Sequence, residues 1–146
     1  MTRQPNNPVI VHGPAELERE GAKVLRMTRA SLMSDTKWRK LFEALDQSSL
    51  EISRCIWKII NRPDEVEGHM PKRGSLHLSR PWIDTLDFGP MPLSSIEWLF
   101  IPRRLPQGSR EQDVDAAKII VDRLGKYPLE VDGFGMKVLG YLPANR

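Results

Sequence analysis

Apolar residues recur at helical spacing in three segments, which predict three helices. The first segment begins at Pro14 and places glutamates before cations, an order that favours the helix dipole. Its apolar stripe is Leu17, Val24, Leu25, Thr28 and Leu32. The second, residues 36–46, has one apolar face, formed by Trp38, Leu41, Phe42 and Leu45. The third starts at a capping-box pattern, Ser109 with Gln112, and runs to about Leu124. Its apolar face is Val114, Ala117, Ile120, Val121 and Leu124.

Alternation of apolar and polar residues predicts strands in the second half of the chain. In residues 95–101, Ile96, Trp98 and Phe100 alternate with Glu97, so we expect Trp98 in the core and Glu97 on the opposite, exposed face. Residues 129–131 and 136–142 flank a glycine-rich turn and predict a hairpin. Residues 50–60 fit a helix by spacing and a strand by their isoleucine content, and 9–11 are a further short apolar run.

The order of these segments predicts an α+β fold in one domain, residues 1–146. We expect a mainly antiparallel sheet of about four strands with three helices packed on it. Residues 1–8 are rich in Pro and Asn and are expected to be loose. Residues 61–93 contain five prolines and predict a long irregular excursion, with a short strand at 76–78. Long loops in compact domains are usually functional.

Composition places the chain among soluble domains. It has 146 residues, a net charge of +3, 40% hydrophobic and 28% charged residues. No apolar run approaches the ~20 residues that a membrane helix needs. The N-terminal residues lack the pattern of a signal peptide. A single cysteine, Cys55, indicates a reducing compartment, and we therefore expect a cytoplasmic protein without membrane contact.

The residues that could support catalysis do not form a recognisable pattern. His12, His69 and His77 lack the tight spacing of metal ligands. Cys55 lies in an isoleucine-rich run, which favours a small buried residue over a nucleophile. The glycine-rich turn at 132–135 precedes a strand, unlike a phosphate loop. We expect no enzyme activity, metal or cofactor.

Charge is unevenly distributed along the chain. Residues 23–40 hold six cations and one anion, whereas residues 81–102 hold three anions and neither Lys nor Arg. The basic segment from Lys23 to Lys40 leaves a nucleic-acid-binding regulator as an alternative function. The net excess is small, and a surface of both signs suits a protein partner, so nucleic acid is the less favoured ligand.

Three local sequences resemble a family of small uncharacterised bacterial proteins. Residues 32–41, LMSDTKWRKL, resemble its "(F/L)MNDTKWREL" motif, and 95–101 resemble its "SIEW" strand. Residues 129–141 resemble its terminal hairpin, which ends in Gly-Tyr. The resemblance covers about residues 30–142 and implies that 54–60 is a strand, as in those relatives. The N-terminal extension and the proline-rich excursion depart from the family pattern.

This resemblance implies a context. Small bacterial proteins of this kind are often immunity proteins of polymorphic or contact-dependent toxin systems, which bind a toxin domain and cover its active site. Nuclease toxins hold a polyanion and are basic there, so an inhibitor should present carboxylates. Residues 81–102 supply them beside aromatic side chains. We therefore expect the protein partner to contact a set of five residues: Trp82, Asp84, Asp87, Phe88 and Glu97.

Overall fold

Two α-helices, seven strands and one short 3-10 helix form the described part of the chain. The computed structural model describes residues 29–72, 74–76, 81–105 and 110–143. In chain order the elements are α2 (Asp35–Gln47), β1 (Arg54–Ile59), β2 (Glu65–His69), β3 (Trp82–Thr85), β4 (Gly89–Pro92), the 3-10 helix η1 (Leu93–Ser95), β5 (Ile96–Pro102), α3 (Val114–Leu124), β6 (Leu129–Val131) and β7 (Gly135–Leu139).

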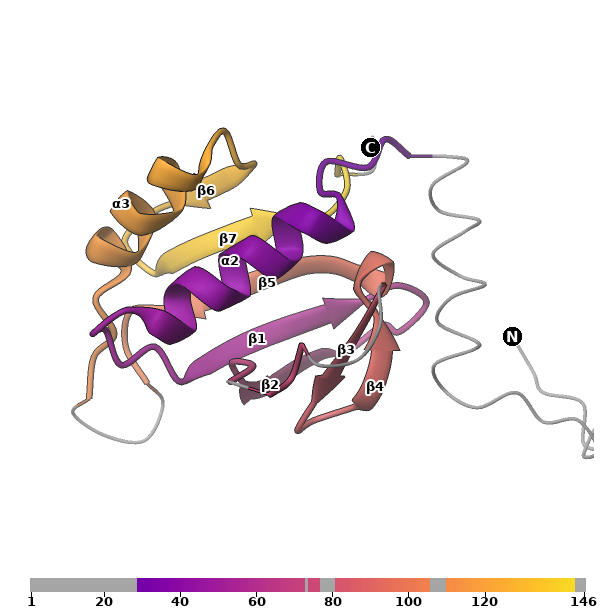
Figure 1. Ribbon diagram of the computed structural model, residues 1–146, viewed down its shortest axis with the longest axis horizontal. Coiled ribbons are helices and arrows are strands. Elements are labelled where there is room, and N and C mark those ends of the chain that lie inside the picture. The colour runs from indigo at the N-terminus through magenta and orange to yellow at the C-terminus, as the bar shows by residue number, and fades with distance from the viewer. Residues whose placement is uncertain (1–28, 73, 77–80, 106–109, 144–146) are drawn as a thin grey trace, which may run out of the picture.

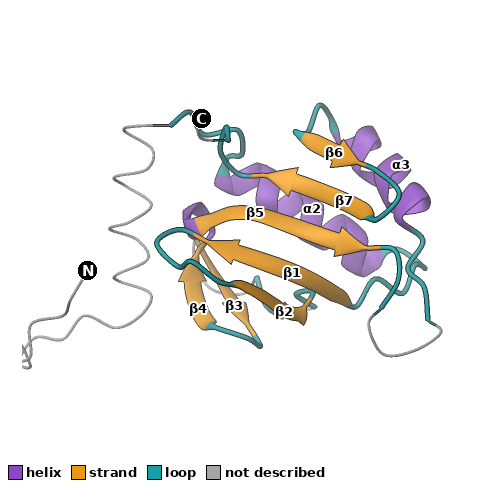
Figure 2. Ribbon diagram, turned by 180° about the vertical axis from the view of Figure 1, so that it is seen from behind, coloured by secondary structure: helices purple, strands orange, loops and turns teal. Residues whose placement is uncertain are grey.

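The strands form one large sheet and one hairpin. Five antiparallel strands take the order β2-β1-β5-β7-β6, and β3 pairs with β4 in a separate two-stranded sheet. Both helices lie on the same face of the large sheet (Figures 1 and 2). The hydrophobic core fills the space between that face and the helices. The opposite face, which we call the open face, carries none of the described elements.

The buried side of each helix is the one its sequence pattern indicates. Ser34 caps α2 by accepting a hydrogen bond from the Lys37 amide at 3.1 Å. The predicted apolar face of this helix is buried: Trp38, Leu41, Phe42 and Leu45. Trp38 stacks on Phe42, whose ring in turn contacts that of Trp57.

The start of α3 differs from the prediction. Asp113, and not Ser109, is the N-cap, and its carboxylate accepts from the Ala116 amide at 3.0 Å. Ser109 lies outside the described residues. Gln112 is buried instead of completing a capping box. Its amide side chain bonds the backbone of Ser53, Arg54 and Pro102, and so joins the approach to α3 to β1 and β5.

The α+β class with an antiparallel sheet is confirmed, whereas the element count is corrected. The sheet has five strands and not four, and a two-stranded hairpin accompanies it. The described residues contain two of the three predicted helices. Ser31, the residue before Leu32, forms an isolated antiparallel bridge with Tyr141. Leu32 itself is not helical, so its predicted place in the first helix is wrong. Residues 14–28, the loose segment 1–8 and the run 9–11 lie outside the described residues.

Two further predictions concern the middle of the chain. Residues 54–59 are a strand, as the family resemblance implies. Residues 61–93, expected to be irregular, contain β2, β3 and β4. The prolines at 90 and 92 are tolerated because β4 pairs only with β3. Leu76 lies in a turn and not in the expected strand, and residues 77–78 are outside the described part.

A bulge reverses the predicted facing of β5. Ile59 pairs with Ile96 and Lys58 pairs with Trp98, which leaves Glu97 as an extra residue. Beyond the bulge, Leu99 and the other odd-numbered positions are buried against the helices. Trp98 therefore lies partly exposed on the open face, and its predicted core position is wrong.

Gly140 lets the bulged strand approach closely. Its amide donates to the Glu97 carbonyl oxygen at 2.8 Å, and a Cβ atom there would collide with the Ile96 carbonyl oxygen. We expect Gly140→Ala to lower the free energy of unfolding by about 2 kcal/mol, because backbone must move to relieve the clash. Urea denaturation measures this. Gly133→Ala is the matched control, since open space surrounds Gly133, and equal losses in both variants would contradict the argument.

Candidate docking surface

The β3–β4 hairpin brings together four of the five residues predicted to contact a partner. Trp82 and Asp84 lie on β3, and Asp87 and Phe88 lie in the turn that leads to β4 (Figure 1). Glu97 is separate from them, at the start of β5. The five residues thus belong to two places in the fold, and their side chains face different surroundings.

Asp87 points into the molecule. Its Oδ2 accepts from the Trp57 indole at 3.2 Å and from the His69 amide at 2.8 Å. Its Oδ1 accepts from His69 Nδ1 at 3.1 Å. The Arg54 guanidinium donates to His69 Nε2 at 2.7 Å, which leaves the ring proton on Nδ1. The Asp87 side chain is only 13% exposed, so it fastens the turn to β1 and β2 and is not a surface carboxylate.

Neighbouring residues hold the same turn. A Cβ atom at Gly68 would collide with the Asp87 carboxylate, so glycine is needed there. Phe88 packs edge-on against Trp57, with ring centroids 6.1 Å apart. The Thr85 hydroxyl donates to the Gly89 carbonyl oxygen and accepts from the Phe88 amide, at 3.0 and 2.9 Å. The turn is therefore fixed on both sides of Leu86.

Leu86 is presented to solvent at the tip of this turn. Its exposed fraction is 79%, although it is a large apolar residue. Asp84 is exposed on the same hairpin, and Trp82 is half-buried. An apolar side chain held in place before binding loses little conformational entropy when a partner covers it. Sequence reasoning missed Leu86, because its only signal is an apolar residue between the turn residues Thr85 and Asp87.

Edge strand β2 and the residue before it carry further exposed carboxylates. Asp64, Glu65 and Glu67 are all exposed, and the Asp87–His69 contact joins this strand to the turn. These carboxylates are evident in the sequence, but residues 61–93 were predicted to be irregular, so the strand that carries Glu65 and Glu67 was not expected. Glu65 and Glu67 pair with Lys58 and Ile56 and so lie on the open face, whereas the turn that carries Leu86 is anchored to Trp57 on the helix side.

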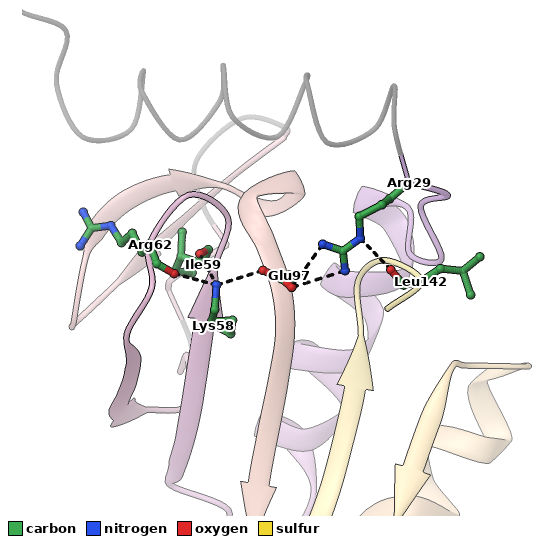
Figure 3. Close-up of polar contacts among 6 residues, drawn as sticks. All are labelled: Arg29, Lys58, Ile59, Arg62, Glu97 and Leu142. Atoms are coloured by element: carbon green, nitrogen blue, oxygen red, sulfur yellow. Dashed lines mark hydrogen bonds and ion pairs between the residues drawn. The ribbon is translucent and has the colours of Figure 1, made fainter. Parts of the chain in front are cut away.

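Glu97 is held in an ion-pair network. Its Oε1 accepts from Lys58 Nζ at 3.0 Å, and its Oε2 lies 3.4 Å from both terminal nitrogens of Arg29 (Figure 3). All three side chains are 19% exposed. Lys58 also donates to the Arg62 carbonyl oxygen, and Arg29 to that of Leu142. Glu97 therefore joins the chain segments around the bulge and is not the freely exposed carboxylate that strand alternation predicts.

We expect Glu97→Gln to lower the free energy of unfolding by about 1 kcal/mol, because Arg29 and Lys58 would then face each other without a carboxylate between them. Urea denaturation at low and at 1 M salt measures this, and the loss should shrink at high salt. Glu111→Gln removes a more exposed pair with Arg104 and should change stability by less than about 0.5 kcal/mol. A loss at Glu97 that is no larger would show that the network is not stabilising.

The basic segment does not present its described cations as one surface. Arg29 pairs with Glu97. Arg39 donates to the Leu76 carbonyl oxygen at 2.6 Å. Lys37 donates to the Lys126 carbonyl oxygen at 2.9 Å and lies over the Tyr127 ring. Lys40 is exposed, whereas Lys23 and Arg26 lie outside the described residues. Internal use of these cations weakens the nucleic-acid alternative.

Of the residues considered for catalysis, Cys55 and His69 belong to the described part of the chain, whereas His12 and His77 lie outside it. Cys55 is buried, as predicted, and burial raises the pKa of its thiol well above the usual value. His69 is committed to Asp87 and Arg54. A cleft of about 350 Å³ lies between the end of α2 and the segment before β1, and the Glu51–Arg110 ion pair lies at its margin. The described residues contain no cluster of acidic, His or Cys side chains able to hold a metal.

No helix in the described part of the chain has the length and apolar character needed to span a membrane.

Comparison with known protein families matches residues 21–145 to one described as "Family of unknown function (DUF6678)". No curated protein and no solved structure matches the chain.

Proposed function

The chain belongs to this family of unknown function, and we propose that it is a toxin-neutralising immunity protein that binds a cognate toxin domain in the cytoplasm and blocks it. The observation that carries this proposal is the exposed Leu86 on a turn that Asp87 and Phe88 anchor. An apolar anchor on a rigid support is a feature that tight protein interfaces use.

The charge near Leu86 favours a partner with a basic surface. Asp84 is an exposed carboxylate on the same hairpin as the exposed leucine. A toxin that acts on nucleic acid has a basic substrate surface, because it must hold phosphates. Carboxylates opposite such a surface steer association and favour the correct partner. The proposed complex therefore places Leu86 in an apolar pocket of the toxin and Asp84 opposite its basic groups.

The test co-expresses this chain with the protein encoded by the neighbouring gene. The proposal expects a stable complex and rescue of growth when that neighbour is toxic. Asp84→Ala should weaken the complex at least tenfold, while Glu130→Ala, which removes an exposed carboxylate of β6, should leave it unchanged. Absence of both complex and rescue would overturn the proposal. Equal weakening by both substitutions would move the docking surface away from the hairpin.

A further inference from the structure

The outer edge of β6 carries backbone groups that point out of the sheet. β6 is the last strand of the large sheet, so it pairs with β7 on one side and with none of the described strands on the other (Figures 1 and 2). The Leu139 amide donates to the Pro128 carbonyl oxygen at 2.9 Å, just before β6 begins. Hydrogen-bonded and non-hydrogen-bonded pairs alternate along an antiparallel ladder. The amides and carbonyl groups of Leu129 and Val131 therefore point away from β7.

The opposite edge of the sheet, strand β2, is protected against pairing with another chain. The turn between β3 and β4 lies against one end of it, where the His69 amide donates to Asp87 at 2.8 Å. Along the rest of β2, the exposed carboxylates of Glu65 and Glu67 would repel a second copy of the same strand. Strand β6 contains a single carboxylate, Glu130, between two half-buried apolar residues. Of the two edges, β6 is the one suited to the addition of a strand.

We propose that β6 pairs antiparallel with β6 of a second copy of this chain, about a two-fold axis at Leu129. The outward amide and carbonyl group of Leu129 then bond those of its copy, and those of Val131 bond Tyr127 of the second copy. The axis is normal to the sheet, so the strands of both copies form one continuous sheet. The helices of both copies then lie on the same side of that sheet and do not obstruct the pairing (Figure 1).

Charge selects this register over its neighbours. With the axis at Leu129, Asp132 lies opposite Lys126 of the second copy, both side chains are exposed, and the symmetry forms this pair twice. The same register places Glu130 opposite an uncharged proline. An axis at Glu130 would oppose the two Glu130 carboxylates, and an axis at Val131 would set Glu130 against Asp132, so like charges disfavour both. Of the three registers centred on β6, one makes the edge complementary to itself.

Sedimentation equilibrium of the full-length chain over a concentration series tests the proposal, and we expect a monomer–dimer equilibrium because so short an edge buries little area. Val131→Pro removes an outward amide without breaking a bond to β7 and should raise the dissociation constant at least tenfold. Val131→Ala shortens the side chain but keeps the amide, and should raise it much less. Lys126→Glu opposes two carboxylates and should also raise it at least tenfold, whereas Lys40→Glu, the same charge change at an exposed position on α2, should leave it unchanged.

Hydrogen exchange resolved to single amides locates the interface in the unmodified chain, so the proposal stays testable even where a variant fails to fold. The Leu129 and Val131 amides should exchange several-fold faster on dilution, whereas the Glu130 amide, which bonds β7, should stay protected at every concentration. A chain that remains monomeric, or a dimer that Val131→Pro and Val131→Ala weaken equally, would overturn the proposal. Protection of Leu129 and Val131 that does not change on dilution would also overturn it. The test involves no toxin, so its result is independent of the proposed function.

Discussion

Asp87→Ala is expected to lower the free energy of unfolding by about 3 kcal/mol. The substitution removes a carboxylate that accepts three hydrogen bonds, from the Trp57 indole and from the amide and ring of His69. Trp57 is fully buried, so its indole N–H would lose a partner that water cannot readily replace. Loss of the anchor also frees the turn that carries Leu86. Urea or thermal denaturation followed by tryptophan fluorescence measures the loss.

Asp84→Ala is the matched control for this prediction. Asp84 lies three residues away on the same hairpin, but its side chain is exposed. Its removal should change stability by less than about 0.5 kcal/mol. Asp87→Asn keeps one acceptor oxygen and should fall between the two alanine variants. Equal stability of the Asp87 and Asp84 variants would show that the contacts of Asp87 do not stabilise the fold.

Leu86→Asp is expected to weaken binding of the cognate toxin about 100-fold, equivalent to ~2.7 kcal/mol, without lowering the melting temperature. The side chain is 79% exposed, so an aspartate there is well hydrated in the free protein. In the proposed complex the same aspartate would enter an apolar pocket and lose that hydration. Titration calorimetry or surface plasmon resonance with the purified toxin domain measures the affinity.

The chain offers a close control for this experiment. Phe134 is 80% exposed at the tip of another hairpin turn, where the Asp132 side chain bonds the turn amides. Phe134→Asp makes the same kind of change at a similarly exposed turn and should leave toxin affinity unchanged. Reduced affinity in the Phe134 variant, with normal affinity in the Leu86 variant, would transfer the docking surface to the β6–β7 hairpin.

Local sequence patterns predicted the structure correctly where residues that are close in the sequence are also close in space. The α2 face around Trp38 and Leu41 follows from helical spacing, and it is buried as predicted. The β6–β7 hairpin follows from the Asp-Gly-Phe-Gly turn, because a short turn sets the pairing of the strands beside it. The burial of Cys55 follows from its apolar run. Strand β1 was ambiguous by pattern, and only the family resemblance favoured it.

The candidate site was less predictable, because strand pairing and distant contacts decide where its side chains point. Alternation along β5 placed Trp98 in the core and Glu97 outside, but the bulge opposite β1 reverses that facing. Asp87 reads as a loop carboxylate until β1 and β2 bring Trp57 and His69 to it.

The sequence by itself determined the α+β class, the helices α2 and α3, and the terminal hairpin. Each of these depends on spacing within a few residues, which the chain carries locally. Only the tertiary structure decided that Asp87 and Glu97 are fastening groups and that Leu86 is exposed. Those outcomes depend on contacts between residues that are far apart in the sequence and on the pairing of the strands. Burial and hydrogen bonding are properties of the assembled sheet and not of any single segment.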